Sequence, residues 1–207
     1  MKKKILVITL IVFTIVSCGP KIYTVQNAEN YTRNHRTLAI LPPKVSIPAQ
    51  KNMSAAALRE NEKSSSLSFQ QEMYIWMLKR SQQGKLNVEI QDVDETIALL
   101  NKIDYFDKAG GKMTPAELAS ALGVDAVLSS NYALSKPMSE GAAIAMGVLV
   151  GAWGPTAKTK VDLNLYDGKT GKMIWNYNHE VGGTFTSHTK LVDALMKNAS
   201  KKLPYKK

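Results

Sequence analysis

The segment "VDLNLYDGKTGKMIW", residues 161–175, decides the fold. Apolar residues alternate with polar ones from Val161 to Leu165, and after the turn "DGKTG" the alternation resumes from Met173 to Tyr177. Two alternating runs joined by a glycine-rich turn are typical of a β-hairpin with one buried face. We therefore expect a sheet built around this hairpin, with helices packed on one or both of its faces.

Three further strands are expected before the hairpin. Residues 37–41 form a short apolar run that ends at Pro42 and Pro43, which suits a buried strand. Residues 86–90 alternate apolar and polar side chains, and residues 124–128 are mostly apolar again. Together with the hairpin, these segments predict about five strands.

Helical patterns separate the strands. Residues 69–84 place apolar side chains at helical spacing and end at a glycine, and residues 92–103 begin with aspartates that can cap a helix. Residues 114–123 begin with "TPAE", which combines a threonine N-cap, a proline at the first helical position and a glutamate at the third, the pattern of a capping box. An amphipathic helix is expected at 191–203. Residues 44–66 are polar and serine-rich, which predicts a loop or a frayed helix.

The expected order is β-α-β-α-α-β, an insertion at 138–156, and then β-β-α. It defines a single α/β domain over residues 37–207, a mixed sheet of about five strands with helices packed on it.

A family resemblance rests on two of these segments. A strand that begins "GVDAVL" (123–128) after a capped helix, followed by the hairpin, resembles periplasmic lipoproteins of the TolB N-terminal-like or CsgG-like fold, a group that includes the curli secretion channel. The resemblance covers roughly residues 37–203, and its sharp part is "YDGKTGKMIW" (166–175). It implies that the protein builds envelope assemblies or regulates envelope enzymes through partner binding. It carries over no catalytic residues.

The N-terminus looks like a lipoprotein signal. Three lysines at positions 2–4 precede residues 5–16, which are apolar except for two threonines and are shorter than the ~20 residues that a membrane-spanning helix needs. The sequence "IVSC" at 15–18 looks like a bacterial lipobox, in which the signal peptide is cut before a cysteine that carries a diacylglycerol. The interpretation is a signal peptide at 1–17 and lipidation of Cys18. The alternatives are a secreted protein cut elsewhere or an uncleaved anchor helix.

Lipidation at Cys18 predicts where the protein resides. Bacterial lipoproteins usually carry three acyl chains, such as palmitate, and two or more chains anchor a protein stably. Gly19 stands where an aspartate would retain a lipoprotein at the inner membrane, so the resemblance favours the periplasmic face of the outer membrane in the cell envelope. Residues 18–36 are polar and aperiodic, and they are expected to form the lipidated N-terminus and a flexible tether.

The chain is basic, with a formal net charge of +10. Without the three signal-peptide lysines, the mature chain has 24 basic and 17 acidic residues, a charge of +7. The lysines are scattered singly apart from Lys201-Lys202 and Lys206-Lys207, and no arginine stripe is present, so nucleic acid is not an expected partner. Attraction to anionic lipid or peptidoglycan, or a merely soluble surface, accounts for the charge.

The insertion contains "GAAIAMGVLVGAWGP" (141–155), which has no charged residue. Ala143, Gly147 and Gly151 recur every four residues, a small-residue stripe that would let two helices approach closely, and Trp153 would suit a membrane interface. Three interpretations remain open. The segment is part of the domain core, it contacts a partner protein or further copies of the chain, or it dips into the membrane beside the lipid anchor.

No catalytic motif is evident. The three histidines, His35, His179 and His188, have no metal-ligand spacing, and neither a nucleophile elbow nor a phosphate-binding loop is present. We expect no enzyme activity, no small-molecule substrate, no metal and no cofactor beyond the covalent lipid on Cys18. The predicted function is a non-enzymatic outer-membrane lipoprotein that acts as an envelope assembly or accessory factor through protein–protein contacts. The alternative is a subunit of a curli-channel-like export pore.

Overall fold

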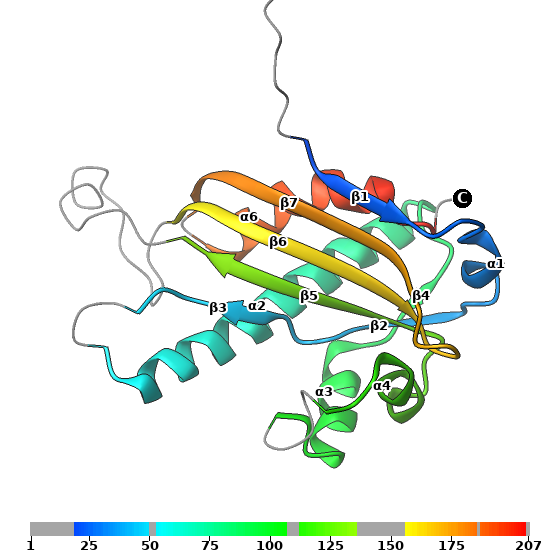
Figure 1. Ribbon diagram of the computed structural model, residues 1–207, viewed down its shortest axis with the longest axis horizontal. Coiled ribbons are helices and arrows are strands. Elements are labelled where there is room, and N and C mark those ends of the chain that lie inside the picture. Colours follow the sequence, from blue (N-terminus) through cyan, green and yellow to red (C-terminus); the bar gives the residue numbers. More distant parts are fainter. Residues whose placement is uncertain (1–18, 50–52, 107–111, 136–155, 186, 206–207) are drawn as a thin grey trace, which may run out of the picture.

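The computed structural model describes residues 19–49, 53–106, 112–135, 156–185 and 187–205 (Figure 1). They form a mixed sheet with the strand order β1-β7-β6-β5-β2-β4, in which β3 pairs with β5 beyond the end of β2. The α/β class is confirmed, and apart from β3 the element order from residue 37 onward is the expected one. The sheet has seven strands in place of about five, because two short strands, β1 and β3, were not expected.

The hairpin forms as the alternation predicts. Strands β6 (Thr156–Asp167) and β7 (Met173–Phe185) are antiparallel, with Leu163 opposite Tyr177. Strand β5 (Ala126–Leu134) pairs antiparallel with β6 on its other side. The parallel part of the sheet follows, with β2 (Thr37–Ile40) beside β5 and β4 (Glu89–Ile90) beside β2.

Residues 21–32 differ from the expected tether. Strand β1 (Lys21–Thr24) pairs antiparallel with β7, and α1 (Glu29–Thr32) follows it. All four side chains of β1 are exposed, so no apolar alternation indicates the strand in the sequence. Main-chain hydrogen bonds to the edge of β7 hold it instead. Only residues 19 and 20 separate the expected lipidation site from the sheet.

Residues 44–66 also differ from the expected loop or frayed helix. Strand β3 (Lys44–Ser46) pairs parallel with β5, and α2 (Ala55–Gln82) is 28 residues long. The hydroxyl of Ser54 caps α2 by accepting a hydrogen bond from the backbone N–H of Ala57. The first half of α2 is mostly exposed and rich in alanine and charged residues, so helix propensity and the cap define it without an apolar stripe.

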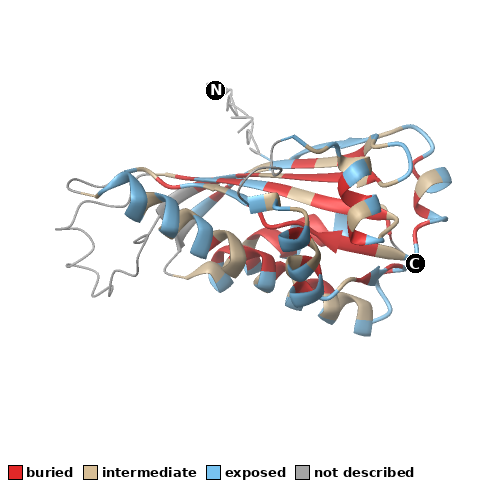
Figure 2. Cartoon of the chain, turned by 90° about the horizontal axis from the view of Figure 1, so that it is seen from below, coloured by how far each residue is buried: buried red, intermediate tan, exposed pale blue. Residues whose placement is uncertain are grey.

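The helices cover the two faces of the sheet unequally (Figures 1 and 2). Helices α2 and α6 (His188–Ala199) pack on one face, and the 3-10 turn η2 (Ser200–Lys202) continues α6. Their core includes Trp175, Tyr177 and Phe69. Helices α3 (Val93–Lys102) and α4 (Pro115–Leu122) cover only part of the opposite face, over β2 and the adjoining ends of β5 and β6. The predicted capping box of α4 is confirmed.

Gly168, in the hairpin turn, tests how tightly α4 packs against the sheet. A Cβ at this position would lie 2.7 Å from both the Ala119 Cβ and the Asp125 carbonyl oxygen. We expect Gly168→Ala to lower the free energy of unfolding by about 1–3 kcal/mol, the usual cost of overpacking, measured by urea unfolding. The matched control is Gly182→Ala, where an added Cβ meets no atom within 4 Å. Equal stability of the two variants would contradict the close packing.

Candidate functional site: the open face of the sheet

The face of the β1-β7-β6-β5 sheet opposite α2 and α6 is the candidate site, and we call it the open face. Because side chains alternate between the two faces of a strand, the register settles which ones it carries. Asn164 lies opposite both Ser129 and Asn176, and Asp162 lies opposite both Asn131 and Asn178. The open face carries Lys21, Tyr23, Ser129, Asn131, Lys160, Asp162, Asn164, Asn176, Asn178 and Glu180. It is therefore a polar surface rich in amides.

A hydrogen-bonded network occupies the centre of the open face. The Asn176 Nδ2 donates to Asp162 Oδ1 at 2.6 Å and to Asn164 Oδ1 at 2.7 Å, and the Asn164 Nδ2 donates to Asp162 Oδ2 at 2.8 Å. Asn178 Nδ2 makes a longer contact of 3.5 Å with Asp162 Oδ1. One carboxylate thus gathers three amides from two strands. The side chains are held in fixed orientations, so this part of the surface is ordered before any partner arrives.

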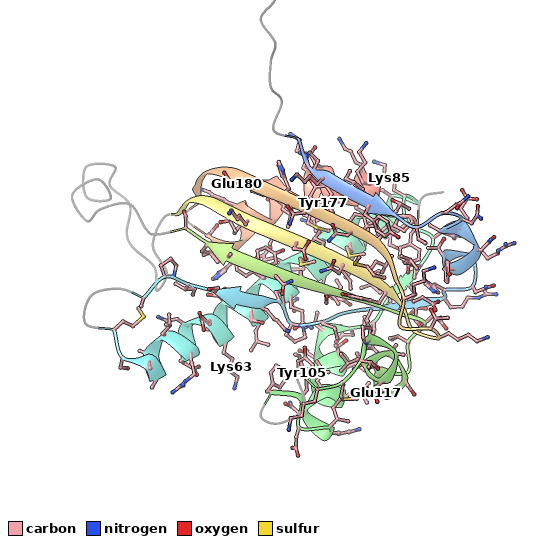
Figure 3. The ribbon with its side chains drawn as sticks, viewed as in Figure 1. Lys63, Lys85, Tyr105, Glu117, Tyr177 and Glu180 are labelled. Carbon is pink, nitrogen blue, oxygen red and sulfur yellow. The ribbon has the colours of Figure 1, made fainter. Side chains whose placement is uncertain are left out.

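A small pocket of about 220 Å³ lies where the open face meets α4. Its lining includes Asn164 and Tyr166 from β6, Tyr105 from the segment after α3, and Met113 just before α4. In Figure 3, Tyr105 lies beside α3 and α4, below the sheet in this view, and Glu180 lies on β7 at the upper left. Burial raises the pKa of Tyr105, so its phenol is neutral at physiological pH. The pocket adds an aromatic and apolar edge to an otherwise polar face.

A second polar cluster, which we call the His35 clasp, joins three distant parts of the chain. The Nδ1 of His35 lies 2.7 Å from the Tyr205 hydroxyl, and its Nε2 lies 2.9 Å from Asp167 Oδ1. The other carboxylate oxygen of Asp167 accepts hydrogen bonds from the backbone N–H and the hydroxyl of Thr170. His35, Asp167 and Tyr205 are all buried. The clasp ties the N-terminal segment and the C-terminal tail to the turn of the hairpin.

The pKa shifts of Tyr205 and Asp167 indicate that the His35 clasp is a structural cluster. Burial raises the pKa of Tyr205, and the nearby Asp167 and Asp125 carboxylates raise it further, so the phenol keeps its proton. Burial also raises the pKa of Asp167, but hydrogen bonds from His35 and Thr170 outweigh it and leave the pKa below its ordinary value. The two ring nitrogens of His35 contact Tyr205 and Asp167 separately, so the imidazole bridges the two side chains. Tyr205, held as a neutral phenol, is a poor nucleophile and a poor base.

Asp125 adds a second carboxylate beside the His35 clasp. Its Oδ2 accepts hydrogen bonds from the backbone N–H groups of Arg36 at 2.7 Å and Thr37 at 3.0 Å. Burial raises its pKa, and these hydrogen bonds outweigh that effect and lower it overall. The carboxylate thereby fixes the start of β2 against the start of β5.

The three histidines lie in three separate places. His35 belongs to the clasp. His179 lies opposite Val161, on the helix-covered face, and its ring centroid is 6.0 Å from that of Tyr177. His188 packs edge-on against Phe69, and burial lowers its pKa against an opposing effect of Glu72. Within the described parts of the chain, no three histidine, cysteine, aspartate or glutamate side chains gather in a way that could hold a metal ion.

The site residues predicted from the sequence lie outside the described residues. These are Cys18 and the small-residue stripe with its tryptophan, namely Ala143, Gly147, Gly151 and Trp153. Lipidation and the role of the insertion therefore stay predictions. Of the helices that the structure describes, none combines the length and the apolar character needed to cross a membrane.

Sequence reasoning missed both polar clusters. A signal for the network existed, because Asp162, Asn164, Asn176 and Asn178 occupy the polar positions of the alternating hairpin, and asparagine and aspartate are uncommon in strands. The His35 clasp had no local signal, since its three residues come from positions 35, 167 and 205. Only the folded topology brings these three side chains together.

Comparisons with known proteins find no family model that matches the chain and no match among curated proteins. Several solved structures are similar at low identity. Lipoprotein GNA1162 from Neisseria meningitidis is 14% identical with a TM-score of 0.44, over 80% of this chain and 98% of its own. PelC from Paraburkholderia phytofirmans, a dodecamer, is 9% identical with a TM-score of 0.43, over 91% and 100%. The LpoB C-terminal domain from Salmonella enterica is 12% identical with a TM-score of 0.35, over 72% and 84%. Likenesses this distant assign no family and no function to the chain.

Asp167→Asn tests the His35 clasp through pH. Because the folded-state pKa of Asp167 is lowered, its charge stabilises the fold above the ordinary carboxyl pKa of about 3.9, and this contribution is lost as pH falls through the folded pKa. We expect the variant to lower the free energy of unfolding by about 1–3 kcal/mol at neutral pH. The difference from wild type should narrow as pH falls below about 4 and close below the folded pKa.

Urea unfolding at a series of pH values measures both effects. Asp193→Asn, on the exposed side of α6, is the matched control and should change stability by about 0.5 kcal/mol or less at every pH. A difference between wild type and Asp167→Asn that did not depend on pH would show that the Asp167 charge contributes nothing.

Proposed function

We propose that the protein is a non-enzymatic lipoprotein of the outer membrane. Acylated Cys18 anchors it at the periplasmic face, and its α/β domain serves as an envelope assembly or accessory factor by holding another envelope protein on the open face. The observation that carries the proposal is the hydrogen-bonded network around Asp162 on that face. The face is broad, polar and ordered in advance, so a protein partner gains contacts there at little cost in side-chain entropy.

The pocket beside the network favours a protein partner over a small ligand. At about 220 Å³ it is smaller than the ~300–1,000 Å³ of typical small-molecule sites. Tyr166 and Met113 at its wall suit one apolar side chain of a partner, while Asn131 and Asn178 on the surrounding face are exposed and suit polar contacts. This division into an apolar spot and a polar surround is typical of protein–protein interfaces.

The short connection between the anchor and the sheet supports the envelope location. Strand β1 begins three residues after Cys18, so an acylated domain would be held close to its bilayer. The uncharged insertion belongs to the same proposal as a second contact, with Ala143, Gly147, Gly151 and Trp153 touching the partner, a further copy of the chain or the membrane.

Site-specific photocrosslinking in cells tests the proposal. A photoreactive amino acid at Asn178, exposed on the open face, should give one defined adduct with an envelope protein from the acylated chain. The same amino acid at Lys79, exposed on α2, is the control and should not give that adduct. Mass spectrometry of the mature chain checks acylation at Cys18, and Cys18→Ala should release the protein from membranes.

Two charge variants decide whether the open face is responsible. Asp162→Lys reverses the charge at the centre of the network, and Asn131→Lys adds a charge beside it, at the position opposite Asp162 on β5. Both should abolish the adduct while circular dichroism shows a folded domain. An adduct that survives both variants would contradict the proposal. A large discrete ring of acylated chains in detergent, measured by light scattering, would replace it with the export-pore alternative.

A further inference from the structure

The C-terminal segment concentrates the positive charge of the mature chain. Residues 188–207 contain six lysines and one aspartate, so their formal charge is 6 − 1 = +5. The whole mature chain from residue 18 has +7. Most of the net charge therefore belongs to α6, η2 and the residues that follow them. Positive charge concentrated in one segment creates a positive electrostatic potential on one part of the surface. Lysines scattered over the whole surface do not have this effect.

The lysines of α6 and η2 lie on the solvent side of an amphipathic helix and its 3-10 extension. The opposite side of α6 is buried against β7 and α2 and carries Leu191, Val192, Leu195, Met196 and Ala199. Lys197, Lys201 and Lys202 are exposed, and the first two are four residues apart, about one helical turn. Lys197, Lys201 and Lys202 thus form a basic ridge along the outside of the domain.

The basic ridge lies beside the edge strand β1. Helix α6 packs on β7, to which β1 is hydrogen-bonded, and Thr24 at the end of β1 shares the lining of one surface hollow with Lys202. Figure 1 shows α6 running behind β7 toward β1. We call the edge of the domain formed by β1 and by Lys197, Lys201 and Lys202 the basic edge; Ile22 points to the α6 side of β1, and Lys21 and Tyr23 point to its open-face side.

Strand β1 adds apolar side chains to the basic edge. Ile22 is 41% exposed and Tyr23 is 49% exposed. They are two of only four large apolar or aromatic side chains that are exposed within the described residues, the others being Ile75 and Phe106. This combination of exposed tyrosine, isoleucine and lysine suits a membrane surface. The aromatic ring and the aliphatic side chain can enter the headgroup region, and the lysine cations can pair with lipid phosphates.

The chain connects the basic edge to the proposed lipid anchor over a very short distance. Residue 18 precedes β1 by three residues, and an extended chain spans at most ~3.5 Å per residue, so the two lie within about 10 Å along the chain. This is about one Debye length at physiological ionic strength, so the charge of Lys21 still acts on the bilayer surface.

We propose that the basic edge lies against the anionic surface of the bilayer that holds the acyl chains, with phospholipid headgroups as its ligand. The inference rests on the proposed anchoring at Cys18. The bilayer faces β1 and the α6–η2 ridge, lysines meet lipid phosphates, and Ile22 and Tyr23 contact the headgroup region.

Vesicle sedimentation tests the basic edge apart from lipidation. The mature chain with Cys18→Ser carries no acyl group and should bind phosphatidylcholine vesicles that contain phosphatidylglycerol, but not pure phosphatidylcholine. Raising the ionic strength from about 0.05 M to about 0.5 M should release it. The triple variant Lys197→Gln, Lys201→Gln, Lys202→Gln should weaken binding by about 100-fold.

The matched control removes three lysines elsewhere. Lys63 and Lys79 on α2 and Lys102 on α3 are exposed, and their change to glutamine lowers the net charge by the same amount. Binding by this control close to that of the unchanged chain supports the proposal. Equal losses in both triple variants would show a response to net charge alone and overturn it, as would the absence of binding to anionic vesicles.

Photocrosslinking to lipid separates this inference from the proposed function. A photoreactive amino acid at Tyr23 in the full acylated chain should form phospholipid adducts in membranes, whereas one at Ile75, 36% exposed on α2, should not. Acylation without a Tyr23 adduct overturns the basic edge and leaves the anchor intact. Absence of acylation on Cys18 overturns the proposed function, while vesicle binding by the Cys18→Ser chain still decides the edge.

Discussion

The register of the β6–β7 hairpin is the constraint on which the rest of the structure depends. With Leu163 opposite Tyr177, the alternating apolar side chains of the hairpin enter the core under α2 and α6, and the amides of Asn164, Asn176 and Asn178 reach the open face. A slip of one residue would turn over the strand that slips, burying Asp162 if it is β6 or exposing Trp175 if it is β7. Burial of an unpaired carboxylate disfavours the first slip, and loss of the largest core side chain disfavours the second. The network on the open face is therefore fixed by the same pairing that fills the core.

The turn of this hairpin also determines where the two ends of the domain lie. Asp167 contacts His35 of the N-terminal segment, and the other ring nitrogen of His35 contacts Tyr205 of the C-terminal tail. Because the His35 clasp holds both segments at one end of the sheet, β1 and η2 come to line the same surface hollow. The His35 clasp contains residue types that also occur in catalytic sites, but its effect here is on the structure. It brings the edge strand that follows the proposed anchor alongside the lysines of the C-terminal segment.

The parts of the fold that could be read from the sequence are those with a strong local signal. Alternation gave the hairpin, and "TPAE" gave the start of α4, because both patterns are complete within a few residues. Strand β1 was missed because all its side chains are exposed, and the first half of α2 because it buries little apolar surface. Such elements are stabilised by main-chain pairing and capping, which leave no hydrophobic period in the sequence.

The residues of the candidate site likewise differ in how strong a local sequence signal they have. The amides of the open face stood at predictable positions of the hairpin, but their mutual bonds depend on cross-strand register, which pattern alone does not specify. The His35 clasp depends on contacts across 132 and 170 positions, which no local pattern contains. The small-residue stripe at Ala143, Gly147 and Gly151 is a sequence signal of the opposite kind, since it is plain in the chain and lies outside the described residues.

The two proposed surfaces fit one orientation of the domain at the membrane. Strand β1 is the edge of the sheet, so a bilayer against the basic edge runs along the strands, and the sheet rises from the membrane with its open face directed sideways. The headgroups would then cover the unpaired main-chain groups of β1, which in an isolated domain would be free to pair with another strand. The amide network would remain accessible to a protein partner in the periplasm, because Asp162 lies two strands away from β1. Anchoring and partner binding thus meet only at β1, and the network around Asp162 stays clear of the bilayer.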